Sequence, residues 1–377
     1  MAVRNQQCFA ILPAMAVFGL ALMAAAPAKA DSGAFLPGIK KHQLLTSTSP
    51  ANGDQNPYAL VVAPVSAGSV QKNDVLVDNF NNIGNLQGTG TTIIDYRPAT
   101  GQMTTFASVP AGLPGCPGGG GLSTAMIMLK SGWVIVGSAP STDGTSKTLG
   151  QGCLIVLDSS GKVTGTITGP EINDPWGNMA VIDNGDTAKI FVSNVGFDIG
   201  TSGASTVRDK ATVLRLDLSI PAGKPPVVTE KTVIADGLSS QADPGVFLIG
   251  PTGLALGRAG QLYVSDAINN RVISIPDAAT RSNSAGTGTE VTSGGFLNRP
   301  LALTTAPNGN LLVINGLDGY VVEVDPVGGK QLGKKLIDGD QAQSPPGSGD
   351  LFGIAINPDG KGFYYVEDDI NALMEAK

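Results

Sequence analysis

The chain has 377 residues, of which 42% are hydrophobic and 15% charged, and its 51 glycines and 25 prolines favour a turn-rich β protein over a helical one. Its 31 acidic residues outnumber the 24 lysines and arginines, for a net charge of −7, and no basic cluster is present, so nucleic acid is not expected as a partner. The single histidine, His42, excludes sites built from several imidazoles, including the common zinc hydrolase signatures.

The first thirty residues predict a secretory signal peptide. Arg4 precedes the apolar run 9–26, which ends in the small-residue cleavage site Ala28-Lys29-Ala30. The alternative is a retained membrane anchor, which Pro13 and the alanine-rich end disfavour. Asp31 rather than cysteine follows the predicted cut, so no lipid anchor is expected. We therefore expect a secreted or periplasmic mature chain that begins at residue 31 and has no membrane segment.

Two cysteines remain after removal of this leader, because Cys8 lies within it. Thiols in an oxidising compartment usually pair, and the alternative is two buried free thiols. We predict a disulfide between Cys116 and Cys153.

Six segments of the mature chain share one layout: a polar residue often followed by proline, an apolar strand, a glycine or asparagine turn, and a second strand that ends in a polar residue. The second strands are 75–79, 134–138, 190–194, 262–266, 311–315 and 364–368. The inner strands that precede them begin near 56, 174, 250, 299 and 350, with a degenerate copy near 121. The spacing suits one four-stranded blade for each copy.

This repeat predicts an all-β fold, a six-bladed β-propeller with four-stranded blades. A linear β-solenoid is the alternative, but its repeats are shorter. The blades are expected approximately at 56–110, 115–168, 173–235, 245–292, 297–338 and 349–377. The last blade lacks one strand, so we expect the N-terminal arm, residues 31–55, to supply it from 42–47 and to close the ring within the propeller domain 56–377.

One blade resembles an NHL repeat. Its opening Pro251-Thr252-Gly253-Leu254-Ala255 and its later Asn269-Asn270-Arg271-Val272 match the usual form, and the best match covers 251–275. The resemblance implies the propeller more firmly than any activity, since the superfamily includes protein-binding modules, lactonases and lyases. The peptide-amidating lyases of this group use several histidines, which this chain lacks, and the Glu, Asn and Asp motifs of gluconolactonases are not found in their family context.

Polar residues at the strand ends are expected to converge at one mouth of the central channel. Those that end the second strands are Asn79, Ser138, Asn194, Asp266, Asn315 and Asp368, and those that open the inner strands include Asn56, Asp174, Arg299 and Asp350. Carboxylate and carboxamide oxygens without imidazole suit calcium, with Asp266, Asp368 and Asn194 as candidate ligands. The alternative is that these side chains cap turns.

Long loops on this same face follow the second strands of blades one to three, at 79–90, 138–152 and 194–210. They are either a recognition surface or inert connectors. Trp176, at an inner-strand opening, either stacks on a ligand or packs against the next blade.

Two functional hypotheses follow from this arrangement. The first is a monomeric binding or scaffold protein that recognises a protein or a small molecule through the long-loop face. The alternative is a calcium-dependent lactonase or hydrolase with its site at the channel mouth. The sequence does not decide whether the protein is an enzyme.

Overall fold

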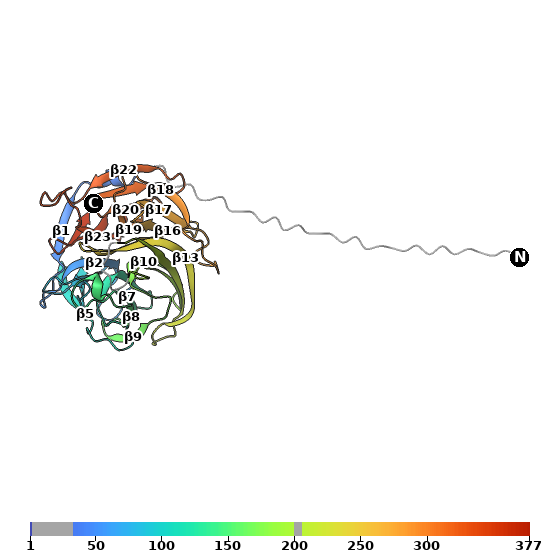
Figure 1. Cartoon of the computed structure of the whole chain (residues 1–377), viewed down its shortest axis with the longest axis horizontal. Helices are drawn as coiled ribbons and strands as arrows, with labels where there is room; N and C mark the ends of the chain where they lie inside the picture. Colours follow the sequence, from blue (N-terminus) through green and yellow to red (C-terminus); the bar gives the residue numbers. More distant parts are fainter. Residues whose placement is uncertain (2–32, 200–205) are drawn as a thin grey trace.

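The computed structural model describes residues 33–199 and 206–377, together with Met1, so the rest of the expected signal peptide lies outside the described residues. Six antiparallel sheets surround a central axis (Figure 1). The predicted six-bladed β-propeller is therefore confirmed. Two short 3-10 helices, η1 (Leu36–Gly38) and η2 (Ser146–Thr148), accompany the strands. In the described ranges, no helix has the length and apolar character needed to cross a membrane.

The first three blades contain the following strands. Blade 1 has β2 (Gln55–Val62), β3 (Val75–Asn81), β4 (Thr92–Arg97) and β5 (Gln102–Ser108). Blade 2 has β6 (Leu122–Met128), β7 (Val134–Ser138), β8 (Cys153–Leu157) and β9 (Val163–Ile167). Blade 3 has β10 (Pro175–Asp183), β11 (Thr187–Asn194), β12 (Arg208–Ser219), β13 (Val227–Asp243) and β14 (Phe247–Ile249).

The last three blades are regular. Blade 4 has β15 (Pro251–Leu256), β16 (Leu262–Asp266), β17 (Arg271–Ile275) and β18 (Thr289–Ser293). Blade 5 has β19 (Pro300–Thr305), β20 (Leu311–Asn315), β21 (Tyr320–Val324) and β22 (Gln331–Leu336). Blade 6 has β23 (Leu351–Ile356), β24 (Phe363–Glu367), β25 (Ala372–Ala376) and, from the N-terminal arm, β1 (His42–Ser47).

Blade 3 departs from the repeat because its outer strand is long. β13 continues past the blade to Asp243, and the short β14 pairs with its end, from Gln241↔Ile249 to Asp243↔Phe247. Residues 247–249, expected in the fourth blade, thus extend the sheet of the third. This extra hairpin brings Phe247 into the core at the channel axis.

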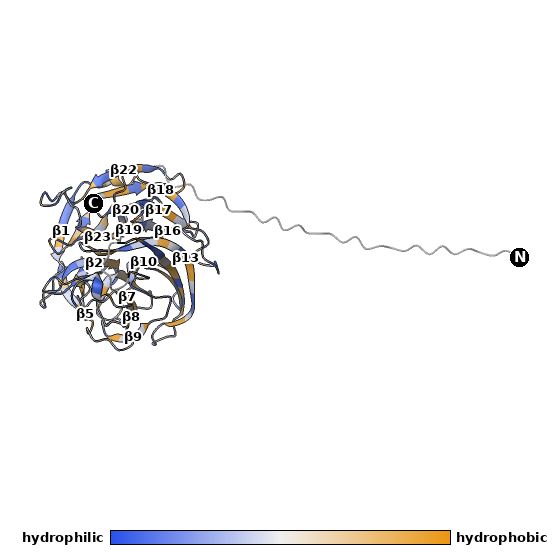
Figure 2. Cartoon of the chain, viewed as in Figure 1, coloured by the Kyte–Doolittle hydropathy of each residue, from blue (hydrophilic) through white to orange (hydrophobic). Residues whose placement is uncertain are grey.

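The blades are held together by apolar side chains between neighbouring sheets. β3, β7, β16 and β20 are buried along their whole length. Figure 2 shows hydrophobic stretches along the strands, whereas loops at the outer edge are largely hydrophilic. A fully buried valine, leucine or isoleucine stabilises a fold by about 1.5–3 kcal/mol, so no blade is stable without its neighbours.

The inner strands approach one another closely around the axis, and glycine makes this possible. Gly177 has φ +73°, and a Cβ atom built on it would lie 1.5 Å from the Thr252 carbonyl oxygen of the next blade. A Cβ atom on Gly253 would lie 2.5 Å from the Leu301 carbonyl oxygen. A larger residue at either position would push two blades apart.

The N-terminal arm closes the ring, as predicted. β1 pairs antiparallel with β25 from His42↔Ala376 to Ser47↔Ala372 and becomes the outer strand of blade 6. Just before it, Leu36 and Ile39 are buried in the core between the last two blades. The backbone N–H groups of Phe35 and Leu36 donate to the buried carboxylate of Glu323 on β21. The arm is therefore part of the folded domain.

The predicted disulfide is confirmed. Cys116, which lies before the inner strand of blade 2, is bonded to Cys153 at the start of β8, with the two Cα atoms 5.3 Å apart. The bond ties the entry of the blade to the end of its long loop.

Candidate functional site

The polar residues that end the second strands hold equivalent positions in five blades. Asn79 pairs with Pro57, and Asn194, Asp266 and Asn315 pair with the prolines that open their own inner strands, while Ser138 of blade 2 pairs with Leu122. In blade 6 the equivalent residue is Glu367, which pairs with Leu351, so Asp368 lies one position further on, in the β24–β25 turn. A valine stands two positions before the polar residue in the other blades, as Val77 does before Asn79, and we call it the marker valine. In blade 6 its equivalent is Tyr365, two positions before Glu367, and not the neighbouring Val366.

These side chains are engaged with the chain close to them. The Asn194 and Asn315 carboxamide oxygens accept hydrogen bonds from the backbone N–H groups of Asn173 and Asn298, at 3.1 and 3.0 Å. Asp266 is fully buried and accepts a hydrogen bond from Arg271 Nε at 2.9 Å. Such contacts are those of turn capping. A ligand role for these residues stays a prediction.

Asparagines in the turn after the second strand link consecutive blades. The Asn270 side chain accepts a hydrogen bond from the backbone N–H of Arg299 at 3.0 Å, and Asn371 does the same for Asn56 at 2.7 Å. Both have a positive φ, 50° and 52°, which asparagine tolerates better than most residues. The NHL-like motif of blade 4 thus has a structural role, and the same contact recurs where the last blade meets the first.

An aromatic plug of five buried residues fills the axis at the end where the inner strands begin. Its members are Tyr58, Phe80, Trp176, Phe247 and Phe352. Tyr58 stacks on Phe352 with ring centroids 3.8 Å apart, and Phe80 contacts both Trp176 and Phe247 edge-on. Burial raises the pKa of the Tyr58 phenol well above its usual value, so it stays protonated. Trp176 is buried within the plug, so in this structure its side chain packs against other aromatic residues, as the second of the two sequence-based alternatives stated.

The long loops of blades 2 and 3 pack over this plug. Ala139 and Leu149 from the β7–β8 loop, and Val195 and Ile199 from the β11–β12 loop, belong to the same apolar cluster. In the blade 1 loop, Gln87 Nε2 donates to the carbonyl oxygen of Gly245 at 3.2 Å. The channel end at which a site was expected is therefore occupied by apolar side chains and covered by loops.

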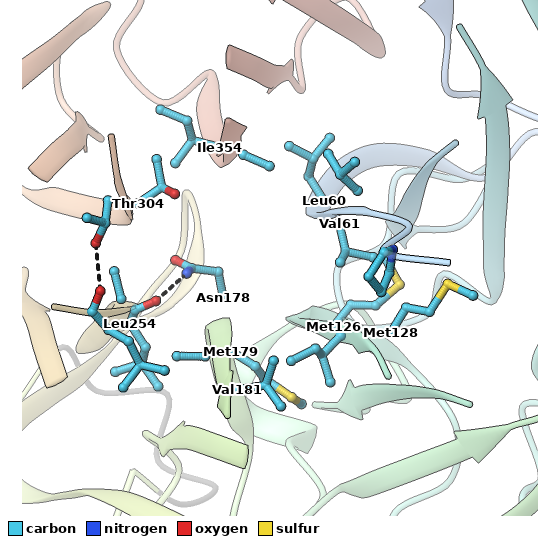
Figure 3. A pocket seen from close by; sticks show the side chains of 18 of the residues that line it. Leu60, Val61, Met126, Met128, Asn178, Met179, Val181, Leu254, Thr304 and Ile354 are labelled. Carbon is cyan, nitrogen blue, oxygen red and sulfur yellow. Dashed lines mark hydrogen bonds between the residues drawn. The ribbon is translucent and has the colours of Figure 1, made fainter. Parts of the chain in front are cut away.

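The channel cavity lies beyond the plug, toward the other ends of the inner strands, with a volume of about 460 Å³. All six inner strands contribute to it (Figure 3). Most of its side chains are apolar, among them Leu60, Met126, Met128, Met179, Val181, Leu254 and Ile354. Each inner strand has a hydrogen-bonded neighbour on one side only, so its other edge faces the axis. The cavity thus combines an apolar wall with backbone polar groups.

Few polar side chains reach the channel cavity. Asn178 Nδ2 donates to the carbonyl oxygens of Leu254 and Leu303, at 2.8 and 3.2 Å, and braces three blades (Figure 3). At the rim, Lys130 Nζ donates to the backbone oxygen of Asp183 at 2.8 Å. Lys130 and Asp183 are the only acidic or basic lining residues in the described part of the chain. This composition suits ligand binding better than acid–base catalysis.

A second polar feature, the acidic pocket, lies where blade 6 begins. It comprises six carboxylates, from the β22–β23 connection, the last residue of β24 and the β24–β25 turn: Asp338, Asp340, Asp350, Glu367, Asp368 and Asp369. Oxygen atoms of Asp340, Asp350 and Asp369 lie within 4.8 Å of one another. Among the described residues, no lysine, arginine or histidine forms an ion pair with any of the six.

Burial and repulsion between neighbouring carboxylates raise the pKa values of four residues of this pocket, Asp350, Glu367, Asp368 and Asp369. Burial, with the nearby charges of Asp369 and Asp338, raises the pKa of Asp350 to about 7. Burial and the same two neighbours raise the pKa of Glu367 to about 8. The pKa of Asp368 is raised in the same direction, by burial first and then by Asp350. At neutral pH the pocket holds protons or requires a cation.

Comparisons with known proteins identify the fold. No family model matches the sequence, and no curated protein matches it. Among solved structures, the chain is similar to a gluconolactonase from Xanthomonas campestris, with a TM-score of 0.52 and 14% identity over 89% of this chain and 88% of that one. It is also similar to a luciferin-regenerating enzyme (0.52, 14%, 88% and 95%) and to a PQQ-bound aldose sugar dehydrogenase from Streptomyces coelicolor (0.51, 15%, 89% and 98%). At these identities the likeness shows the fold alone.

Sequence reasoning missed the channel cavity and named only two members of the acidic pocket, Asp350 and Asp368. The cavity residues were read as core strands, since an apolar residue that lines a cavity has the same pattern as one that packs. Asp338 and Asp340 lie in a connection that no repeat register covers, although the runs Asp338-Gly339-Asp340 and Glu367-Asp368-Asp369 are visible in the sequence. Their proximity depends on the contact between the blade 5 exit and the blade 6 turn.

Proposed function

We propose that this protein binds a small amphipathic molecule in the channel cavity. The observation that carries the proposal is a channel closed at one end by the aromatic plug and open at the other, with an apolar wall built from all six blades. A largely apolar pocket with a few convergent polar groups is the usual form of a small-molecule site. Such a ligand would place its apolar body against the half-buried Val61, Val181 and Leu256 and its polar end near Lys130 and Asp183 at the rim.

The compartment and the repeat family enter as part of this proposal. The disulfide supports an exported protein, since such bonds persist in oxidising compartments. The asparagine contacts of Asn270 and Asn371 support an NHL-like propeller, because they give the motif of blade 4 a structural purpose. The long-loop face as a docking surface for a protein remains a separate proposal.

A binding titration tests the proposal. The probe is N-phenyl-1-naphthylamine, an apolar fluorophore, added to purified mature protein. Ala355 lines the cavity and is half-buried, so Ala355→Trp should fill part of it and weaken binding by about tenfold or more. The matched control is Ala259→Trp, in the exposed turn that ends the inner strand of blade 4. Absence of probe binding, or equal loss in both variants, would refute the cavity as the site.

A calcium-dependent lactonase is the second candidate. It is favoured by the fold similarity to a gluconolactonase, and the aromatic plug fills the channel axis at the end where its site was expected. Its metal would lie away from the axis, in the acidic pocket, which includes the candidate ligand Asp368 and offers further carboxylate oxygens. Hydrolysis of a lactone panel, measured with calcium and with chelator, decides between the two: calcium-dependent turnover lost in Asp350→Asn would establish the enzyme.

A further inference from the structure

The acidic pocket contains a buried carboxylate oxygen without a partner. Asp350 is 4% exposed, and its Oδ2 atom has no hydrogen-bond partner, although Asp340 and Asp369 offer oxygens within 4.8 Å. Asp338, which lies beside Asp350, also has an unpartnered buried Oδ2 atom. An isolated buried charge is costly, so these two carboxyl groups either hold protons or face a bound cation, and a cation satisfies both oxygens at once.

We infer that the acidic pocket binds one calcium ion, with Asp340, Asp350 and Asp369 as carboxylate ligands. The three residues come from two separate segments: Asp340 and Asp350 from the β22–β23 connection, and Asp369 from the β24–β25 turn. Oxygens within 4.8 Å of one another can share one ion, and calcium accepts such ligands in flexible geometry, whereas magnesium requires a near-ideal octahedron. Oxygen donors without imidazole or thiolate select a hard cation.

Two further buried oxygens without hydrogen-bond partners belong to residues that neighbour these ligands. Asp338 contributes its unpartnered Oδ2 atom, and the Gln343 side-chain oxygen, also buried and without a partner, belongs to a residue that contacts Asp340. Calcium takes six to eight ligands, and water would supply the remainder.

The ion would connect the pocket to the closure of the ring. Asn371 ends the turn that holds Asp369. Its backbone oxygen accepts a hydrogen bond from the Thr48 N–H of the N-terminal arm at 2.8 Å, and its side-chain oxygen accepts one from the backbone N–H of Asn56. A cation that fixes this turn also fixes the junction at which the last blade meets the arm and the first blade. We therefore expect calcium to raise the melting temperature and to protect the arm from proteolysis.

Calorimetric titration of chelator-treated mature protein with calcium chloride tests the inference, and it is independent of any ligand in the channel cavity. One calcium should bind per chain. Asp350→Asn and Asp369→Asn should each weaken binding by about tenfold or more, because each removes one ligand charge. The matched control is Asp186→Asn, an exposed carboxylate in the β10–β11 turn, which should leave the affinity unchanged.

The melting temperature shows whether a variant that binds calcium weakly is still folded. In chelator, Asp350→Asn should melt no lower than the unmodified protein, because it removes a like charge beside Asp338. Weaker calcium binding by this folded variant then reflects a lost ligand. If Asp350→Asn does not fold, the calcium affinity is measured on Asp369→Asn, because Asp369 is exposed and its substitution leaves the core intact. No calcium binding at millimolar concentration, equal affinity in all variants, or magnesium affinity equal to that for calcium would overturn the inference.

Discussion

Glu323 anchors the N-terminal arm, and Glu323→Gln is expected to loosen it. Its two carboxylate oxygens accept hydrogen bonds from the backbone N–H groups of Phe35 and Leu36 and from the Asn308 and Asn310 side chains, at 2.7–3.0 Å. Glutamine keeps the shape but turns one acceptor into a donor that faces other donors. Two donors then lose a charged partner, each worth about 1.5–3 kcal/mol, so we expect a loss of about 3 kcal/mol in the free energy of unfolding.

Urea unfolding of the mature protein measures this loss, and limited proteolysis locates it. Trypsin should cut the variant faster after the exposed Lys40 and Lys41, which precede β1. Glu290→Gln, an exposed residue on β18, is the matched control and should change the free energy by no more than about 0.5 kcal/mol. If Glu323→Gln unfolds and is cut like the control, the arm is held by strand pairing alone and the reasoning is wrong.

Three further predictions follow from the structure. Replacing Cys116 and Cys153 by serine should lower the free energy of unfolding by about 4 kcal/mol, the chain-entropy value for a separation of 37 residues, measured by denaturant unfolding. Gly177→Ala should prevent correct assembly of the inner strands or lower the free energy of unfolding by about 3 kcal/mol or more. Gly185→Ala, with nothing within 4 Å, should lower it by about 1 kcal/mol because of its positive φ. Equal effects of the two substitutions would contradict the argument that Gly177 permits the close approach of two blades. Metal-free protein should lose stability as pH rises from about 4 through about 8. The pKa of Asp350 is raised to about 7, so over this range the folded state holds a proton that the unfolded state has released. Melting temperatures that rise over this range would contradict the prediction.

The strand order and the closing strand could be predicted from the sequence, because both depend on local patterns. The repeat placed each blade, and the missing strand of blade 6 pointed to 42–47, which is the observed β1. Export chemistry similarly predicted the disulfide from two cysteines. Each of these inferences uses a pattern that is complete within one repeat, or, for the disulfide, within one pair of cysteines.

The site depends on geometry that no single repeat contains. Asp368 was placed one residue out of register because Val366 matched the marker better than Tyr365, and only the pairing of Leu351 with Glu367 reveals the offset. Trp176 had the same apolar signal whether it stacks on a ligand or packs in a plug, and the position of Phe247 decided the matter.

By itself, the sequence determined an all-β propeller closed by its own N-terminus, because alternating apolar strands, turns and an incomplete last blade allow few other ways to bury the core. Only the tertiary structure decided where a ligand has room and where charge gathers. The channel is filled at one end because five aromatic side chains, from three inner strands, from β3 and from β14, meet on the axis. The acidic pocket exists because the exit of one blade turns back onto the next, which brings together carboxylates that are distant in the chain.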